Sequence, residues 1–115
     1  MAKEIDNFAI LKEVYLHYNR LQGEIPSEIN PHNLEELLLG QNNLVGVVPA
    51  AIFDVSTLKD LALQDNYLSG SLSSIADVQL PNLERLFLWG NNFSGTIPHF
   101  IFNASKLSII QLTYN

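Results

Sequence analysis

The chain has 115 residues, of which 12 are acidic and 6 basic, so its formal charge is −6, and it contains no cysteine. This length favours a single domain, and 47% hydrophobic with 16% charged residues argues against intrinsic disorder. The acidic balance argues against a nucleic-acid partner, and the lack of cysteine excludes disulfides, thiolate zinc sites and a cysteine nucleophile.

Leucine and asparagine recur on a fixed period along the whole chain. Five segments follow the pattern L-x-x-L-x-L-x-x-N, with Val14 and Ile110 in place of the second leucine, and begin at Leu11, Leu34, Leu58, Leu83 and Leu107. Their intervals of 23, 24, 25 and 24 residues are typical of a leucine-rich repeat. We therefore expect one repeat array over residues 1–115. Residues 1–10 would end a preceding repeat, 11–33, 34–57, 58–82 and 83–106 would be full repeats, and 107–115 would begin a fifth.

The middle of each repeat alternates apolar and polar residues, which is the period of a strand with one buried face. Successive strands in one direction predict an α/β solenoid: a curved parallel sheet with one strand per repeat and short helical or 3-10 turns on its convex side. The expected buried rows are Leu16, Leu39, Leu63, Leu88 and Leu112, and Val14, Leu37, Leu61, Leu86 and Ile110. The convex turns would be anchored by Ile29, Ile52, Ile75 and Ile101.

Asparagine ends every predicted strand. A carboxamide can donate two hydrogen bonds and accept others, so a column of asparagines can pair backbone groups where the chain turns. The predicted structural ladder comprises Asn19, Asn42, Asn66, Asn91 and Asn115. A glycine follows in each full repeat (Gly23, Gly46, Gly70 and Gly95), which indicates a positive φ or a close backbone approach.

The combined motif, L-x-x-L-x-L-x-x-N-x-L-x-G-x-I-P, resembles the plant-type leucine-rich repeat over nearly the whole chain. The chain is similar to ectodomain fragments of plant leucine-rich-repeat receptor-like serine/threonine kinases. The segments NLERLFLWGNNFSGTIP and IFNASKLS resemble the subgroup that includes the flagellin and elongation-factor receptors. The resemblance implies a larger receptor, located on the extracellular side of the plasma membrane, with its kinase outside this chain.

No pattern for chemistry is present in the sequence. Phosphate-binding, kinase and metalloprotease motifs are missing, and His17, His32 and His99 fall in different repeats without metal-ligand spacing. We therefore expect no enzyme activity, no cofactor and no metal. The longest uncharged run, residues 86–105, contains too many polar side chains for a spanning helix, so no direct membrane contact is expected.

Binding is the remaining route, and the register predicts which side chains point outward from the strands. Glu13, Glu36 and Asp60 form an acidic line that suits a basic partner, or is simply a solvated face balanced by Arg85. Phe87 and Trp89 are either anchors for an extended partner or pack against their neighbours. A second cluster, of Tyr15, His17 and Tyr18, lies three strands from Phe87 and Trp89, roughly 15 Å by strand spacing. The candidate binding residues are Tyr15, His17, Tyr18, Glu36, Asp60, Arg85, Phe87 and Trp89.

Two N-x-S sequons give the chain's hint of a compartment. Asn92 and Asn103 are candidate N-glycosylation sites if the chain enters the secretory pathway. Alternatively, Asn92 and Ser94 belong only to the turn of the repeat.

The leading functional interpretation is a non-catalytic recognition segment that binds a peptide or protein, with a co-receptor as a further partner, through the outward strand face. A freestanding binding protein of the polygalacturonase-inhibitor type is the alternative, and a soluble intracellular scaffold is the third interpretation. Because end repeats lacking polar caps expose apolar surface, end-to-end self-association is also expected.

Overall fold

The computed structural model describes residues 11–27, 32–72, 80–98, 101 and 104–115. Residues 1–10, Ile29, Ile75, His99 and Asn103 therefore lie outside the described part. Its strands alternate along the chain between two parallel sheets. In chain order the elements are β1 (Glu13–Tyr15), β2 (Gln22–Glu24), β3 (Glu36–Leu38), β4 (Asn43–Val47), the 3-10 helix η2 (Ala50–Asp54), β5 (Asp60–Ala62), β6 (Tyr67–Ser71), β7 (Arg85–Phe87), β8 (Asn92–Ser94) and β9 (Ile109–Gln111).

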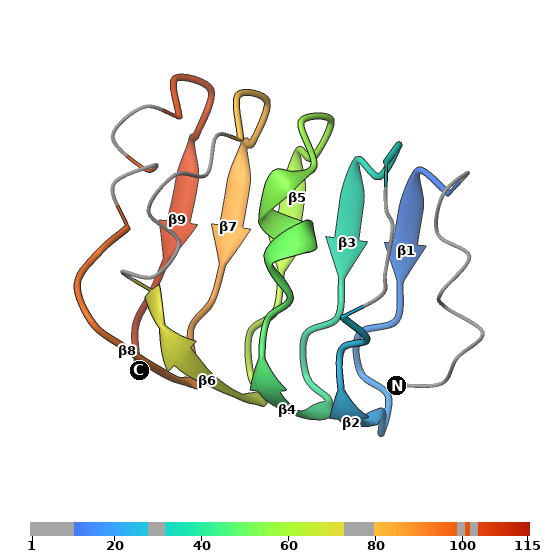
Figure 1. The fold of residues 1–115 in the computed structure, drawn as a ribbon, viewed down its shortest axis with the longest axis vertical. Coiled ribbons are helices and arrows are strands. Elements are labelled where there is room, and N and C mark those ends of the chain that lie inside the picture. The colour runs from blue at the N-terminus through green and yellow to red at the C-terminus, as the bar shows by residue number, and fades with distance from the viewer. Residues whose placement is uncertain (1–10, 28–31, 73–79, 99–100, 102–103) are drawn as a thin grey trace.

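The first sheet has five strands in the order β1-β3-β5-β7-β9, all parallel (Figure 1). Equivalent residues of successive repeats face each other, so that Glu13 pairs with Glu36, Glu36 with Asp60, and Asp60 with Arg85. The predicted solenoid, with one strand of this sheet per repeat, is confirmed. Each strand comes from the alternating half of its repeat.

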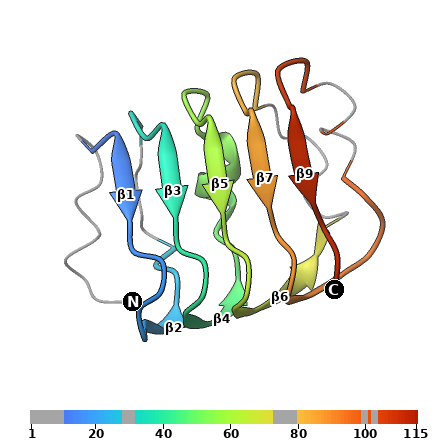
Figure 2. The ribbon, with the colours of Figure 1, turned by 180° about the vertical axis from the view of Figure 1, so that it is seen from behind.

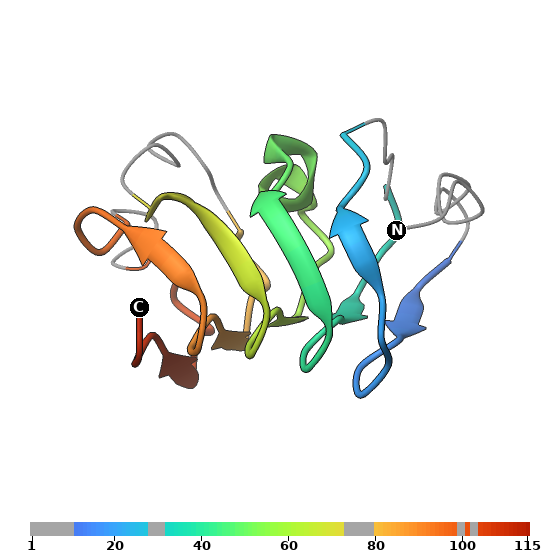
Figure 3. The ribbon, with the colours of Figure 1, turned by 90° about the horizontal axis from the view of Figure 1, so that it is seen from below.

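A second sheet, β2-β4-β6-β8, follows the carboxyl ends of the first four strands of the larger sheet (Figure 3). The sequence did not predict this sheet, because its strands have only three to five residues, and a glycine lies within or directly after each. Gly23, Gly46, Gly70 and Gly95 have φ values of 79°, 83°, 105° and 84°. The predicted positive φ at these glycines is therefore confirmed.

The core lies between the first sheet and the helical side of the chain. Leu37, Leu61 and Leu86 are completely buried, as are Leu39 and Leu63. η2 adds Ile52 and Phe53 to the same cluster, and a 3-10 turn residue at Ile101 packs against it.

The predicted buried rows are confirmed at the outer position Val14 but are wrong at three other outer positions. Ile110 is 39% exposed, and Leu16 and Leu112 are only partly buried. A strand of this sheet is covered by the strands on both sides of it, and β1 and β9 each have one neighbouring strand. Burial in this fold is thus supplied by the adjacent repeat as well as by the residue's own position.

The asparagines that end the strands join consecutive repeats. The Asn66 side-chain nitrogen lies 3.0 Å from Leu39 O and 3.1 Å from Leu63 O, and its oxygen accepts from Leu44 N at 3.0 Å. The same arrangement is found at the equivalent positions Asn42, Asn91 and Asn115. Asn19 in the first full repeat donates to Leu16 O and His17 O. Four of these carboxamides therefore pair polar backbone groups of two repeats, whereas these partners of Asn19 lie in its own repeat.

The two faces of the first sheet differ. η2 lies against the face turned toward the viewer in Figure 1, whereas no described helix or strand lies in front of the opposite face in Figure 2. We call this second face the open face. Within the described residues, no helix is long and apolar enough to cross a membrane.

Candidate ligand-binding surface

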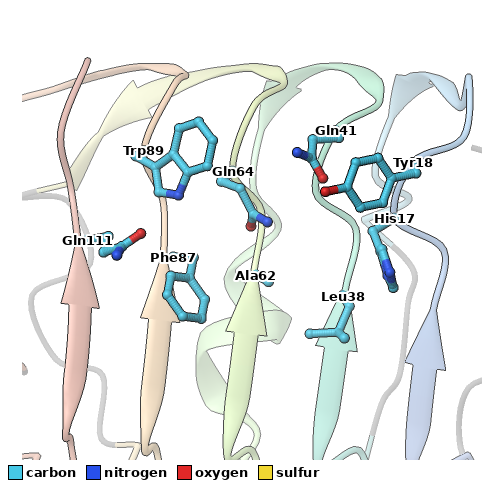
Figure 4. Close-up of a pocket in the computed structure, with 9 residues that line it drawn as sticks. All are labelled: His17, Tyr18, Leu38, Gln41, Ala62, Gln64, Phe87, Trp89 and Gln111. Atoms are coloured by element: carbon cyan, nitrogen blue, oxygen red, sulfur yellow. The ribbon is translucent and has the colours of Figure 1, made fainter.

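The open face carries a hollow of about 400 Å³ near the carboxyl ends of its strands (Figure 4). Side chains from all five repeats surround it. They are His17, Tyr18, Leu38, Gln41, Ala62, Gln64, Phe87, Trp89 and Gln111. We refer to these nine residues as the hollow.

Aromatic side chains stand on both sides of the hollow (Figure 4). Phe87 and Trp89 are half-buried on one side. On the other side the rings of His17 and Tyr18 meet edge-to-face with centroids 5.3 Å apart, and Tyr18 is 73% exposed. Phe87 and Trp89 therefore each leave part of their surface accessible in the hollow.

The centre of the hollow is small and uncharged. Ala62 is buried, Leu38 is half-buried, and the carboxamide of Gln64 lies over Gly40. A Cβ atom at Gly40 would be 2.5 Å from Gln64 Nε2, so the absence of a side chain there makes room for the amide. The Gln64 oxygen is buried and accepts no hydrogen bond within the described part of the chain. It is therefore a buried acceptor that would gain a hydrogen bond if the flexible Gln64 side chain turned toward a ligand.

One column of residues with left-handed backbone includes two residues of the hollow, Tyr18 and Gln41. Tyr18, Gln41, Asp65 and Tyr114 occupy the same repeat position and have φ between 56° and 59°, while Gly90 at that position has φ 68°. Left-handed backbone is costly for residues other than glycine. The sequence did not predict it, because Gly90 alone among these five residues is of the type that favours it.

A row of charged residues crosses the open face before the hollow. This charged row consists of Glu13, Glu36, Asp60 and Arg85, which occupy one register position of the sheet. Arg85 donates from Nε and from its terminal nitrogen to the two oxygens of Asp60, at 2.7 Å each. These hydrogen bonds and the charge of Asp60 raise the pKa of the Arg85 guanidinium. Asp60, 7% exposed, is thus held by its neighbour.

Glu36 is also engaged with a neighbouring repeat. Tyr15 donates a hydrogen bond from its hydroxyl to a carboxylate oxygen of Glu36. This bond, with burial and the charge of Glu13, raises the pKa of Tyr15 to about 12. The predicted acidic line is therefore interrupted by two internal interactions, both across adjacent strands.

The predicted site residues fall into two groups in space. His17, Tyr18, Phe87 and Trp89 line the hollow, whereas Tyr15, Glu36, Asp60 and Arg85 interact in pairs around the charged row. Five residues of the hollow were not among the predicted binding residues. These are Leu38, Gln41, Ala62, Gln64 and Gln111. They occupy the same repeat positions as Tyr15, His17 and Tyr18, and that shared register was the signal that could have identified them.

The remaining predicted positions lie elsewhere. Asn92 is exposed on β8 of the second sheet. Asn103 lies outside the described residues. Across the described ranges, no group of three or more His, Asp or Glu residues is arranged to hold a metal ion.

Known proteins share both the repeat and the fold of this chain. The leucine rich repeat family models match residues 11–31 and 32–93. Receptor-like kinase TMK4 of Arabidopsis thaliana is 32% identical over 68 residues, which is 59% of this chain and 7% of that protein. The chain thus spans a small part of this relative.

Solved structures of plant receptors superimpose on the chain. PEPR1–AtPEP1 has a TM-score of 0.86 at 33% identity, covering 97% of this chain and 16% of that one. The leucine-rich repeat ectodomain of the receptor kinase SOBIR1 from Arabidopsis thaliana has a TM-score of 0.85 at 33% identity, covering 100% and 61%. The plant peptide hormone receptor RGFR1 in complex with RGF2 has a TM-score of 0.72 at 32% identity, covering 98% and 22%. The chain therefore belongs to the leucine-rich repeat family, with repeats of the type found in plant receptor ectodomains.

Proposed function

We propose that this chain is a non-catalytic ligand-binding segment of a plant receptor ectodomain, and that an extended peptide or protein segment lies across the strands of its open face. The observation that carries the proposal is the hollow itself. It is uncovered, apolar at its floor, flanked by aromatic side chains and supplied with carboxamides from three repeats. Clefts of this kind bury apolar anchors and orient them with a few polar groups.

The arrangement suits a peptide that crosses several strands. The hollow reaches from His17 in the first full repeat to Gln111 in the last strand, a distance of about 19 Å at ~4.8 Å per strand. An extended segment rises about 3.3 Å per residue, so some six residues would cross the face. The charged row beside it leaves Glu13 as an exposed carboxylate that would attract a basic residue of the ligand.

Two similarities support this proposal. PEPR1–AtPEP1 and the RGFR1–RGF2 complex have the fold of this chain, and RGFR1 is a plant peptide hormone receptor. By the same reasoning, we infer that the parent protein presents these repeats on the extracellular side of the plasma membrane, and that a co-receptor is a further partner.

The test uses the tryptophan of the hollow, which is the single tryptophan of the sequence. Random peptides displayed on phage are selected on the immobilised chain, and those recovered are titrated while Trp89 emission is recorded. We expect the selected peptides to shift Trp89 emission. We also expect Phe87→Ala to weaken them about tenfold or more, because it removes one wall of the hollow.

Tyr67→Ala is the matched control. Tyr67 is 59% exposed on β6 of the second sheet, so its loss should leave the affinity unchanged. Circular dichroism checks that both variants are folded. Peptides that bind Phe87→Ala as tightly as the original chain, or that bind without changing Trp89 emission, would refute the proposal.

A further inference from the structure

Asn92 and its neighbour Asn91 have opposite roles. Asn91 is 6% exposed, donates to Leu63 O at 2.9 Å and accepts from Leu68 N at 3.0 Å. Asn92 is exposed, and its side chain makes no hydrogen bond with any residue in the described part of the chain. The turn of the repeat therefore uses the first asparagine and has no evident need for the second.

The surroundings of Asn92 are uncharged and partly apolar. No residue of β4, β6 or β8 carries a charge. Asn92 pairs with Ser69, and Ser69 pairs with Val47, so these three residues form one row across the outer face of the second sheet. Val47 is 64% exposed, and Tyr67 on the same face is 59% exposed. Exposed apolar side chains therefore lie in and beside the row that contains Asn92.

Asn92-Phe93-Ser94 is an N-x-S sequon, so an oligosaccharide attached to Asn92 would lie beside these apolar side chains. Phe93 points inward and is 8% exposed, whereas Asn92 and Ser94 are exposed. At ~4.8 Å per strand, Asn92 is about 5 Å from Ser69 and about 10 Å from Val47. The first sugars of an oligosaccharide on Asn92 would span this distance.

We propose that Asn92 carries an N-linked oligosaccharide whose first sugars lie over β6 and β4 and cover Val47 and Tyr67. The donor is a lipid-pyrophosphate-linked oligosaccharide of the secretory pathway. The carboxamide nitrogen of Asn92 loses a proton and bonds to the anomeric carbon of the sugar. The bond from that carbon to the pyrophosphate oxygen breaks, and the lipid pyrophosphate leaves. The glycan stands on the second sheet, away from the hollow of the open face.

The experiment expresses the chain behind a cleavable secretion leader in plant cells, with Asn103→Gln so that Asn92 is the remaining sequon. Mass spectrometry of the medium and of the cell lysate is expected to find one glycan. Peptide N-glycosidase should release it and convert Asn92 to Asp. Ser94→Ala should abolish the modification, because the sequon needs the hydroxyl. Asn43→Gln, at the equivalent position of an earlier repeat that is no sequon, should leave it unchanged.

The covering role is tested on the same sample. Enzymatic removal of the glycan should raise the fluorescence of a hydrophobic dye, and the rise should be smaller in Tyr67→Ser, which lacks the aromatic part of the patch. An unmodified Asn92 in both medium and lysate would overturn the glycan. A glycan whose removal leaves dye binding unchanged would overturn its position over β6 and β4. Neither result depends on whether the hollow binds a peptide.

Discussion

The charged row and the hollow share the open face but use their polar groups differently. In the charged row, Arg85 pairs with Asp60 and Tyr15 bonds to Glu36, so these charges are satisfied within the chain. In the hollow, Gln64 has a buried oxygen without a partner among the described residues, next to exposed aromatic surface. The difference teaches that the charged side chains mainly connect repeats, while the neutral hollow is where a ligand would gain contacts.

The strands that carry the charged row and the hollow end at the asparagine ladder, so substituting a central ladder asparagine should have the largest effect on stability. Asn66→Ala removes the partner of Leu44 N and leaves the carbonyls of Leu39 and Leu63 with fewer donors. Leu39 O still accepts from Asn42 and Leu63 O from Asn91, so Leu44 N is the group left unpaired. An unpaired buried backbone group costs roughly 1–3 kcal/mol, and we expect a loss of this size in urea denaturation. Asn19→Ala, at an exposed rung, is the control and should cost about 1 kcal/mol or less. Equal losses of stability in the two variants would contradict a larger contribution from the buried Asn66.

Breaking the charged row should reduce stability without affecting the hollow. Arg85→Ala leaves the carboxylate of Asp60, which is 7% exposed, without its partner. We expect a lower urea midpoint, by less than in Asn66→Ala because the Arg85 side chain is half-exposed. Affinity for the selected peptides should stay within about threefold. A tenfold loss of affinity at unchanged stability would place Arg85 in the binding site instead.

Gly40→Ala should do the reverse and change the hollow with little loss of stability. The new Cβ would collide with the carboxamide of Gln64, which is the far end of a flexible side chain and can swing away. We expect the free energy of unfolding to fall by less than about 1 kcal/mol. Trp89 emission in the free protein and peptide affinity should both change. Unchanged affinity would show that Gln64 does not contribute to binding.

The smallest effect is expected from the hydrogen bond between Tyr15 and Glu36. The folded chain raises the pKa of Tyr15 to about 12. The hydrogen bond therefore contributes its full stabilisation of the folded state below the ordinary tyrosine pKa of ~10. It is lost as pH rises from about 10 through 12. An ultraviolet titration should contain a phenolate component near pH 12 that is missing in Tyr15→Phe. If that variant leaves the titration curve unchanged, Tyr15 does not form this bond in solution.

The period of the leucines was enough to predict the first sheet, its register and the residues that face its core. It was not enough to predict the hollow, because the hollow depends on the size and type of each side chain as well as on its repeat position. Phe87 and Trp89 stand out as large aromatics, whereas Ala62 contributes by being small and Gln64 by lying over a glycine. These contributions depend on the neighbouring repeat, which a single repeat motif does not describe.

Two features of the backbone could not be predicted from the sequence for a related reason. The positive φ of Tyr18, Gln41 and Asp65 is imposed by the turn before each ladder asparagine, not by the residues themselves. The strands of the second sheet are stabilised by stacking of one repeat on the next and have weak strand propensity of their own.

The pairing of the two sheets also bears on how the chain can be lengthened. Repeats of 23, 24 and 25 residues keep the same offset between the registers of the two sheets. Where Glu13 pairs with Glu36 in the first sheet, Gln22 pairs with Asn43 in the second. Where Asp60 pairs with Arg85, Ser69 pairs with Asn92. All variation in length is therefore taken up between the end of a second-sheet strand and the next open-face strand. Extra loops or tags inserted there are expected to leave the register of the open face unchanged, so the chain can be lengthened on its helical side without disturbing the hollow.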